Sequence, residues 1–100
     1  MPKVYITSRS AHDYSDAKNY GEIVFLSEGP MNRFNVNHIE RMFYDKLRSS
    51  GPDDYLLLTG LGVMNSIACW IFGCLHKRLN LLLYKQGVYI ERNMKFREEG

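Results

Sequence analysis

A segment near the middle of the chain combines two glycines with three polar side chains, between one apolar run and a longer one. Gly60 and Gly62 allow a tight turn and a close approach of the backbone, and the first N–H groups of a following helix carry partial positive charge. Thr59, Asn65 and Ser66 add hydrogen-bonding side chains, so the segment predicts a site for a phosphate or a carboxylate. It is neither a complete GxGxxG motif nor a P-loop. The alternative is a plain strand-to-helix turn in which Asn65 or Ser66 caps the helix.

A second polar run follows the first apolar run of the chain and holds Ser8, Arg9, Ser10 and His12. Arg9 offers a positive charge to an anion. Glu28, in a later loop with a glycine and a proline, offers a carboxylate to a ribose or a base edge. Plain surface turns are also rich in such residues, which is the alternative interpretation of both loops.

Nucleophilic and metal chemistry have little support. Cys69 and Cys74 are five residues apart in one apolar stretch, so on a helix they point to different sides, and burial would raise the pKa of a thiol there. The three histidines are far apart in the sequence, and no CxxC or HExxH spacing occurs. The sequence therefore predicts no catalytic residue, no metal and no cofactor.

The elements that must position these residues follow from apolar patterning. Short β-branched or continuous apolar runs predict strands, and a stripe formed by Ile39, Met42, Phe43 and Leu47 predicts an amphipathic helix that Asn35 or Asn37 caps. The predicted strands cover residues 3–8, 22–27, 54–59, 79–84 and 88–91, and the predicted helices cover 14–20, 34–50 and 63–76.

The alternation of strands and helices predicts parallel strands joined by helices that cover both faces of a sheet. We expect a compact Rossmann-like or flavodoxin-like three-layer α/β sandwich, mostly parallel, with an antiparallel hairpin at one edge. Residues 1–91 would form a single domain and residues 92–100 a frayed tail. Ligands bind such sheets at the carboxyl ends of the strands, which here are residues 8–12, 27–30 and 59–62.

The composition agrees with one soluble globular domain: 100 residues, of which 45% are hydrophobic and 24% charged, with two cysteines. A chain of this length buries only about 60–65% of its unfolded surface. The helix predicted from Val63 is apolar on nearly every side, more than one face of a small sheet can cover. Either the helix predicted at residues 34–50 covers it, or part of it, around Trp70, is buried in a homo-oligomer. We expect a homodimer that buries part of this helix or the edge strand.

The 13 Lys and Arg and 11 Asp and Glu are scattered along the chain, whereas nucleic-acid binding surfaces normally cluster their charges, so the sequence argues against a nucleic-acid partner. The longest apolar run, Val63 to Leu75, has 13 residues, fewer than the roughly 18 that span a bilayer. The start of the chain lacks the apolar stretch of a signal peptide. These features predict a protein of the cytoplasm with no membrane partner.

Three segments, at residues 12–17, 20–29 and 52–58, are similar to small α/β proteins of bacterial viruses and prophages. The similarity spans residues 4–91. That family has no established activity, so the resemblance supplies no catalytic or binding residues. It implies a viral context, in which a small domain without catalytic machinery interferes with a process of the host.

The sequence thus favours a non-catalytic module that binds a nucleotide or another phosphorylated ligand, with the sequestration of a host nucleotide signal in the host cytoplasm as its role. One alternative is a protein–protein inhibitor of a host factor, which would leave the crevice empty. A third, less favoured, is a small nucleotide hydrolase that uses Glu28 or His12.

Overall fold

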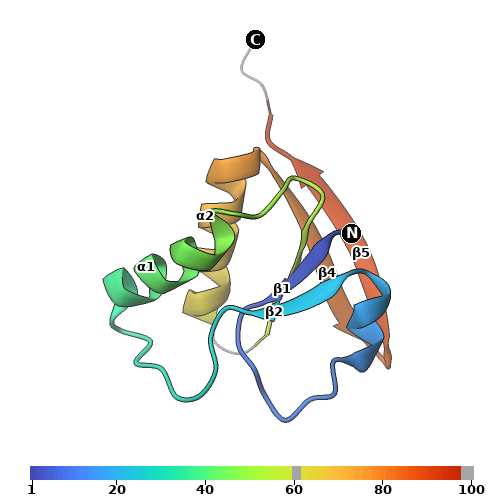
Figure 1. Cartoon of the computed structure of the whole chain (residues 1–100), viewed down its shortest axis with the longest axis horizontal. Coiled ribbons are helices and arrows are strands. Elements are labelled where there is room, and N and C mark those ends of the chain that lie inside the picture. The colour runs from blue at the N-terminus through green and yellow to red at the C-terminus, as the bar shows by residue number, and fades with distance from the viewer. Residues whose placement is uncertain (60–61, 98–100) are drawn as a thin grey trace.

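The computed structural model describes residues 1–59 and 62–97, which form five strands, two α-helices and one short 3-10 helix (Figure 1). In chain order the elements are β1 (Lys3–Ile6), η1 (Ser15–Asn19), β2 (Glu22–Phe25), α1 (Val36–Leu47), β3 (Tyr55–Leu57), α2 (Gly62–His76), β4 (Arg78–Lys85) and β5 (Val88–Lys95). All five predicted strands and three predicted helices are present.

The strands form one sheet in the order β2-β1-β3-β4-β5. β1 pairs in parallel with both β2 and β3, and β3 pairs in parallel with β4. β5 closes the sheet as an antiparallel edge strand on β4. The mostly parallel α/β sheet with an antiparallel edge hairpin is therefore confirmed, and its first four strands have the flavodoxin-like order.

The direction of each crossover decides which face of the sheet its helix covers. The chain moves from β1 to one side to form β2, and then back past β1 to form β3 and β4. Crossovers of one hand that run in opposite directions lie on opposite faces. Accordingly α1 and α2 lie together on one face and η1 on the other (Figure 1), so the third layer of the sandwich is thin.

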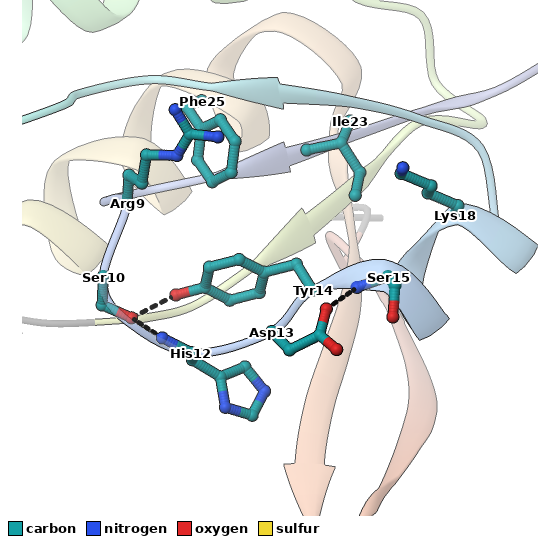
Figure 2. A pocket seen from close by; sticks show the side chains of 9 residues that line it. All are labelled: Arg9, Ser10, His12, Asp13, Tyr14, Ser15, Lys18, Ile23 and Phe25. Carbon is teal, nitrogen blue, oxygen red and sulfur yellow. Dashed lines mark hydrogen bonds between the residues drawn. The ribbon is translucent and has the colours of Figure 1, made fainter.

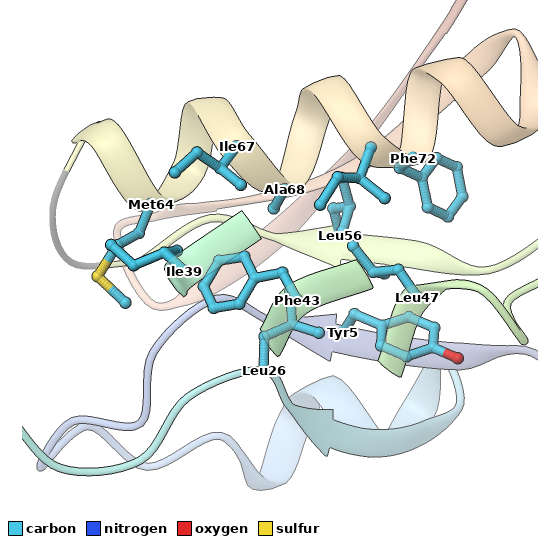
Figure 3. Packing of buried hydrophobic residues seen from close by; sticks show 11 residues of the cluster. Tyr5, Leu26, Ile39, Phe43, Leu47, Leu56, Met64, Ile67, Ala68 and Phe72 are labelled. Atoms are coloured by element: carbon cyan, nitrogen blue, oxygen red, sulfur yellow. The ribbon is translucent and has the colours of Figure 1, made fainter. Parts of the chain in front are cut away.

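The main core lies between the sheet and the two α-helices (Figure 3). Ile39, Phe43 and Leu47 are four residues apart on α1, and each is fully buried, because this spacing keeps side chains on one face of a helix. They pack with Tyr5 and Leu56 of the sheet and with a row of apolar side chains from α2, namely Met64, Ile67, Ala68, Ile71 and Phe72.

A smaller cluster covers the opposite face. Val4, Ile6, Leu57 and Leu82 pack there against Tyr14 and Ala17. Tyr14 directly precedes η1 and Ala17 lies within it. Since so little chain covers this face, the loop between β1 and η1 and the side chains of β2 border solvent.

Both α-helices begin and end within three residues of the predicted positions. α1 begins after Asn35, one of the two predicted caps, although the Asn35 side chain makes no capping hydrogen bond. α2 ends at His76, and Lys77 takes the left-handed conformation with φ of 58° while its N–H donates to the Gly73 carbonyl. No helix among residues 1–59 and 62–97 is long and apolar enough to cross a membrane.

The frayed tail predicted from Arg92 onward is wrong, because β5 continues to Lys95 in register with β4. Beyond it, the Phe96 N–H donates to the Lys77 carbonyl at 2.9 Å. The Phe96 ring lies against α2, so close that a Cβ atom on Gly73 would be 2.6 Å from its Cζ atom. Polar residues on the outer edge of a hairpin lack the apolar alternation that identifies strands, which is why the prediction stopped early.

Candidate functional site

The reversal of the chain around β1 places two strand ends side by side. β1 lies between β2 and β3, and the connections from β1 and from β3 leave toward opposite faces of the sheet. This is the topological switch point, where open α/β sheets bind their ligands. Thr7 follows β1 there, and Thr59 follows β3 two residues after the end of the strand.

A set of hydrogen bonds ties these two ends together. The Thr7 Oγ1 atom accepts a hydrogen bond from the Thr59 N–H at 2.9 Å, and its single proton is shared between the Thr59 carbonyl at 2.8 Å and the Asn65 Oδ1 atom at 2.7 Å. The Thr59 hydroxyl accepts from the Ser8 N–H and donates to the Ser8 carbonyl. We call Thr7, Ser8, Thr59 and Asn65 the switch-point clamp. It joins β1, β3 and the first turn of α2.

The clamp uses side chains that the sequence assigned to a ligand. Asn65 neither caps α2 nor faces away from the sheet, because its amide oxygen meets Thr7. Ser66 does not cap the helix either, since its hydroxyl donates to the Gly62 carbonyl within the first turn. Gly62 opens α2 with free space where a Cβ would lie. Gly60 lies outside the described residues.

A groove of about 420 Å³ lies beside the clamp, on the face that η1 covers. Figure 2 shows its walls: the loop after β1 forms one side, β2 contributes Ile23 and Phe25, and η1 contributes Lys18. We call this feature the η1 groove; its remaining lining residues are Arg9, Ser10, His12, Asp13 and Tyr14 of the loop and Ser15 at the start of η1.

Arg9 is held at one end of the groove by two contacts. Its Nη1 atom lies 2.8 Å from Glu28 Oε1, with both side chains more than half exposed. Its guanidinium carbon lies 4.5 Å from the centroid of the Phe25 ring. A guanidinium has five N–H donors, so the ion pair with Glu28 leaves donors for a second anion.

The loop that lines the groove is ordered by its own hydrogen bonds. The Ser10 hydroxyl lies 2.6 Å from the Tyr14 hydroxyl, and the Asp13 carboxylate accepts from the Ser15 N–H at 2.9 Å. The hydrogen bonds from the Ser15 backbone and side chain, with smaller contributions from the nearby charges of His12 and Lys18, lower the pKa of Asp13. Asp13 is therefore a carboxylate at neutral pH.

Aromatic rings connect the groove to the β4–β5 hairpin. His12 packs edge-on against Tyr14 and Tyr84 at centroid distances of 5.0 and 4.8 Å. Tyr14 in turn packs edge-on against Phe25 at 5.7 Å. His12 is thus a contact between the loop and the hairpin, and its Nε2 atom lies 3.5 Å from the Tyr89 hydroxyl.

The ten residues predicted for the site are divided by the structure. Arg9, Ser10 and His12 line the η1 groove and Glu28 joins it through Arg9, whereas Ser8, Thr59 and Asn65 belong to the clamp. Ser66 and Gly62 are exposed on α2, which packs on the opposite face of the sheet.

The groove residues that lie in or beside secondary structure were not predicted from the sequence. Tyr14 and Lys18 were assigned to a short helix and Phe25 to a strand covered on both faces. Their signal was weak: an aromatic residue directly before a short helical segment and a basic residue within it, next to a strand that only this 3-10 helix covers.

Comparison with known protein families gives a match for this chain. Residues 2–96 match the family model described as Phage Pam3 gp32-like protein. The chain belongs to this family. The similarity to proteins of bacterial viruses is thereby confirmed over nearly the whole chain, including the strand β5 that the sequence had cut short. Neither the curated proteins nor the solved structures give a significant match.

Proposed function

We propose that the protein is a non-catalytic module that binds a small phosphorylated ligand, best fitted by a nucleotide, in the η1 groove. One observation carries the proposal: a groove of about 420 Å³ at the switch-point end of the sheet sets the cations Arg9 and Lys18 beside the rings of Tyr14 and Phe25. Small-molecule sites commonly have volumes of about 300–1,000 Å³ and few polar groups.

Charge within the groove favours one orientation of the ligand. Arg9 lies at the end of the loop nearest β1, while the carboxylate of Asp13 lies at the other end beside Ser15 (Figure 2). A phosphate would meet Arg9, with its remaining N–H donors, and would be repelled from Asp13. A ribose hydroxyl or an exocyclic amino group would donate to Asp13 instead, with Lys18 near enough to contribute to the lowered pKa of that carboxyl.

The contacts of the hydroxyl and imidazole groups support binding rather than turnover. The Ser10 hydroxyl pairs with the phenol of Tyr14. His12 meets Ser10 through its backbone N–H, while its ring packs against Tyr14 and Tyr84. An activated serine needs a base within hydrogen-bonding reach of its hydroxyl, and the imidazole of His12 is directed elsewhere. Sequestration of a nucleotide signal in the host cytoplasm is the role that this arrangement suits in a phage protein.

Mass spectrometry of the small molecules that co-purify with the protein from host extract, followed by calorimetric titration, tests the proposal. We expect a phosphorylated ligand that is recovered intact after denaturation. Arg9→Ala should weaken its binding by about 1–2 kcal/mol, the loss of a charge-assisted hydrogen bond. Arg33→Ala removes an exposed arginine from a loop outside the groove and is the matched control.

Recovery of a hydrolysed product would replace the proposal with a small hydrolase. Absence of any ligand, together with equal affinities of Arg9→Ala and the unaltered protein for added nucleotides, would favour an inhibitor that acts through protein contacts.

We also propose that the protein is a homodimer in which the outer surface of the α1–α2 pair is covered. Trp70 is 61% exposed there, and with Tyr44 and Leu75 it borders an apolar groove of about 150 Å³ between the two helices. Solvent-exposed apolar side chains gathered in one place mark interaction surfaces. Light scattering should give twice the monomer mass for the unaltered protein and the monomer mass for Trp70→Ala. A monomer at micromolar concentration in both cases would contradict the dimer.

A further inference from the structure

We propose that a second pocket, at the opposite end of the sheet, binds single-stranded nucleic acid. This amino-end pocket has a volume of about 640 Å³ and is lined by residues 76–78, residues 95–97 and Pro52. Residues 76–78 join α2 to β4, and residues 95–97 end β5 and continue beyond it. The strands β1 to β4 begin at this end, so the pocket is separate from the η1 groove at their carboxyl ends.

Four basic side chains line the pocket: Lys77, Arg78, Lys95 and Arg97. None of its described lining residues is acidic. The chain has 13 Lys and Arg against 11 Asp and Glu. Glu98 and Glu99 lie outside the described residues, so the described residues outside the pocket include nine basic and nine acidic ones. Among the described residues, the excess of positive charge is thus at one end of the sheet, which attracts a polyanion.

The pairing of β4 with β5 forces two of these cations together. Arg78 and Lys95 are direct partners across the antiparallel ladder, and like charges opposite each other destabilise a sheet. Arg78 is also positioned by its Nε–H, which donates to Asn80 Oδ1 at 3.1 Å, while the Asn80 amide donates to the Pro52 and Asp54 carbonyls. An anion between the two cations would remove the repulsion.

Asp54, an acid close to the pocket residue His76, is already engaged by backbone groups. Asp53 and Glu91 border a neighbouring pocket on Arg78. Asp54 is 8% exposed, and its two carboxylate oxygens accept hydrogen bonds from the Lys3 and Gly51 N–H groups. Lysine and arginine side chains of the pocket form no ion pair with a carboxylate within residues 1–59 and 62–97.

Phe96 adds a stacking surface between two of the cations. Its backbone N–H donates to the Lys77 carbonyl, and one part of its ring rests on Gly73, where any larger residue would collide. Half of the Phe96 side chain is exposed. A fixed, half-exposed ring flanked by Lys95 and Arg97 is the combination with which proteins stack a base and follow the backbone of a single strand.

The shape and size of the pocket favour a single strand over other polyanions. The cations line a concavity, which a flexible strand can enter and a rigid duplex cannot. The volume of about 640 Å³ exceeds what one phosphate needs, and the carboxylates of an acidic peptide would make no use of the Phe96 ring, whereas every nucleotide of a single strand brings both a charge and a stacking base. The occupant is therefore a short stretch of single-stranded DNA or RNA.

Fluorescence anisotropy with a labelled 12-nucleotide oligo-dT tests the inference. We expect saturable binding whose affinity falls with salt, with a log–log slope of about −2 to −3 for three to four phosphate contacts. Lys95→Ala with Arg97→Ala should reduce the affinity at least tenfold and make the slope shallower by about 1 to 1.5, as two lost contacts imply. Lys85→Ala with Arg92→Ala, which removes two exposed cations outside the pocket, is the matched control and should bind as the unaltered protein does.

Phe96→Leu separates stacking from charge, because it keeps an apolar side chain next to Gly73. We expect a severalfold weaker affinity with an unchanged salt slope, and full affinity in Phe96→Trp. Thermal unfolding keeps the result interpretable, since Lys95→Ala relieves a like-charge pair and should not lower the Tm.

Three results would overturn the inference: no saturable binding of oligo-dT, an equal loss in the control double variant, or equal affinity for a duplex or a poly-glutamate peptide of the same charge. An equal loss in Phe96→Leu and Phe96→Trp would also contradict the stacking role.

Discussion

The two ends of the sheet differ in how their charged side chains are paired. At the carboxyl ends of the strands, charges of both signs are paired or adjacent: Arg9 with Glu28, and Lys18 near Asp13. At the amino ends the acid Asp54 is buried beneath the surface, and the cations Arg78 and Lys95 are left facing each other. The carboxyl end is therefore suited to a small ligand with both donors and acceptors, and the amino end to a polyanion.

The difference has a structural origin. The carboxyl end needs the switch-point clamp because the chain reverses around β1 there, and the clamp uses hydroxyl and amide groups. At the amino end, the side chains of Asn80 and Asp54 form hydrogen bonds with backbone carbonyl and N–H groups. Among the described residues, the side chains of Lys77, Lys95 and Arg97 take no part in these hydrogen bonds, whereas Arg78 donates to Asn80.

The largest effect should come from Asp54→Ala, which leaves two backbone N–H groups unpaired in a buried site. We expect a loss of about 3 kcal/mol in the free energy of unfolding, because hydrogen bonds to buried charged groups are among the costliest to break. Urea unfolding measures it. Asp53→Ala changes the exposed neighbour and should fall within about 0.5 kcal/mol of the unaltered protein; equal losses in the two variants would remove Asp54 from the support of the amino end.

Thr7→Val tests the clamp at the other end with a side chain of similar shape. Thr7 is fully buried, so the change leaves the Thr59 N–H without its acceptor and should cost about 1–3 kcal/mol in urea unfolding. Thr7→Ser keeps the hydroxyl and should retain the hydrogen bonds. If the serine variant loses as much stability as the valine variant, packing of the methyl group rather than the clamp holds β1 to β3.

Lys95→Glu should have a smaller effect, and of the opposite sign. It places an acid opposite Arg78 and converts a like-charge cross-strand pair into an attractive one, which should stabilise the fold by about 0.2–1 kcal/mol. The same variant should lose oligo-dT binding. A drop in the Tm would show that the paired cations do not repel each other, and the contrast between the two ends would be weakened.

The smallest effect should be the pH dependence that His76 contributes. Burial lowers the pKa of His76 from its ordinary value of 6.5, partly opposed by Asp54, and its Nε2 atom lies 2.8 Å from the Ser50 hydroxyl. A folded-state pKa below the unfolded one means that this stability is complete above pH 6.5 and is lost as the pH falls through the folded pKa.

Chemical unfolding at pH 7.5 and at pH 5 should therefore show a larger decrease for the unaltered protein than for His76→Gln. The lowered pKa of Asp13 acts in the same direction but in a separate window, below its ordinary value of 3.8. Parallel pH profiles for the two proteins would show that protonation of His76 is not linked to unfolding.

Apolar patterning was enough to predict all five strands, both α-helices and the antiparallel hairpin. Each is encoded locally: Ile39, Phe43 and Leu47 can share a buried stripe only on a helix, and the run from Ile23 to Leu26 is short enough to be a strand. Parallel pairing was also accessible, since strands that alternate with helices imply it. The strand order β2-β1-β3-β4-β5 was not predicted. The thinness of the layer that η1 forms could not be predicted, because it depends on how much of the loop after β1 packs against the sheet.

What remained for the tertiary structure to decide was which polar side chains meet. Thr7, Thr59 and Asn65 satisfy one another because the ends of β1, β3 and α2 converge, and Lys77, Arg78, Lys95 and Arg97 gather because β5 pairs in register with β4 and Phe96 rests on Gly73. Along the sequence, Lys77 and Arg78 are at least 17 residues away from Lys95 and Arg97, so the four residues do not form a cluster there. Local propensity sets secondary structure within a few residues, whereas charge and hydrogen-bonding neighbours are set by long-range strand register, which a single sequence does not display.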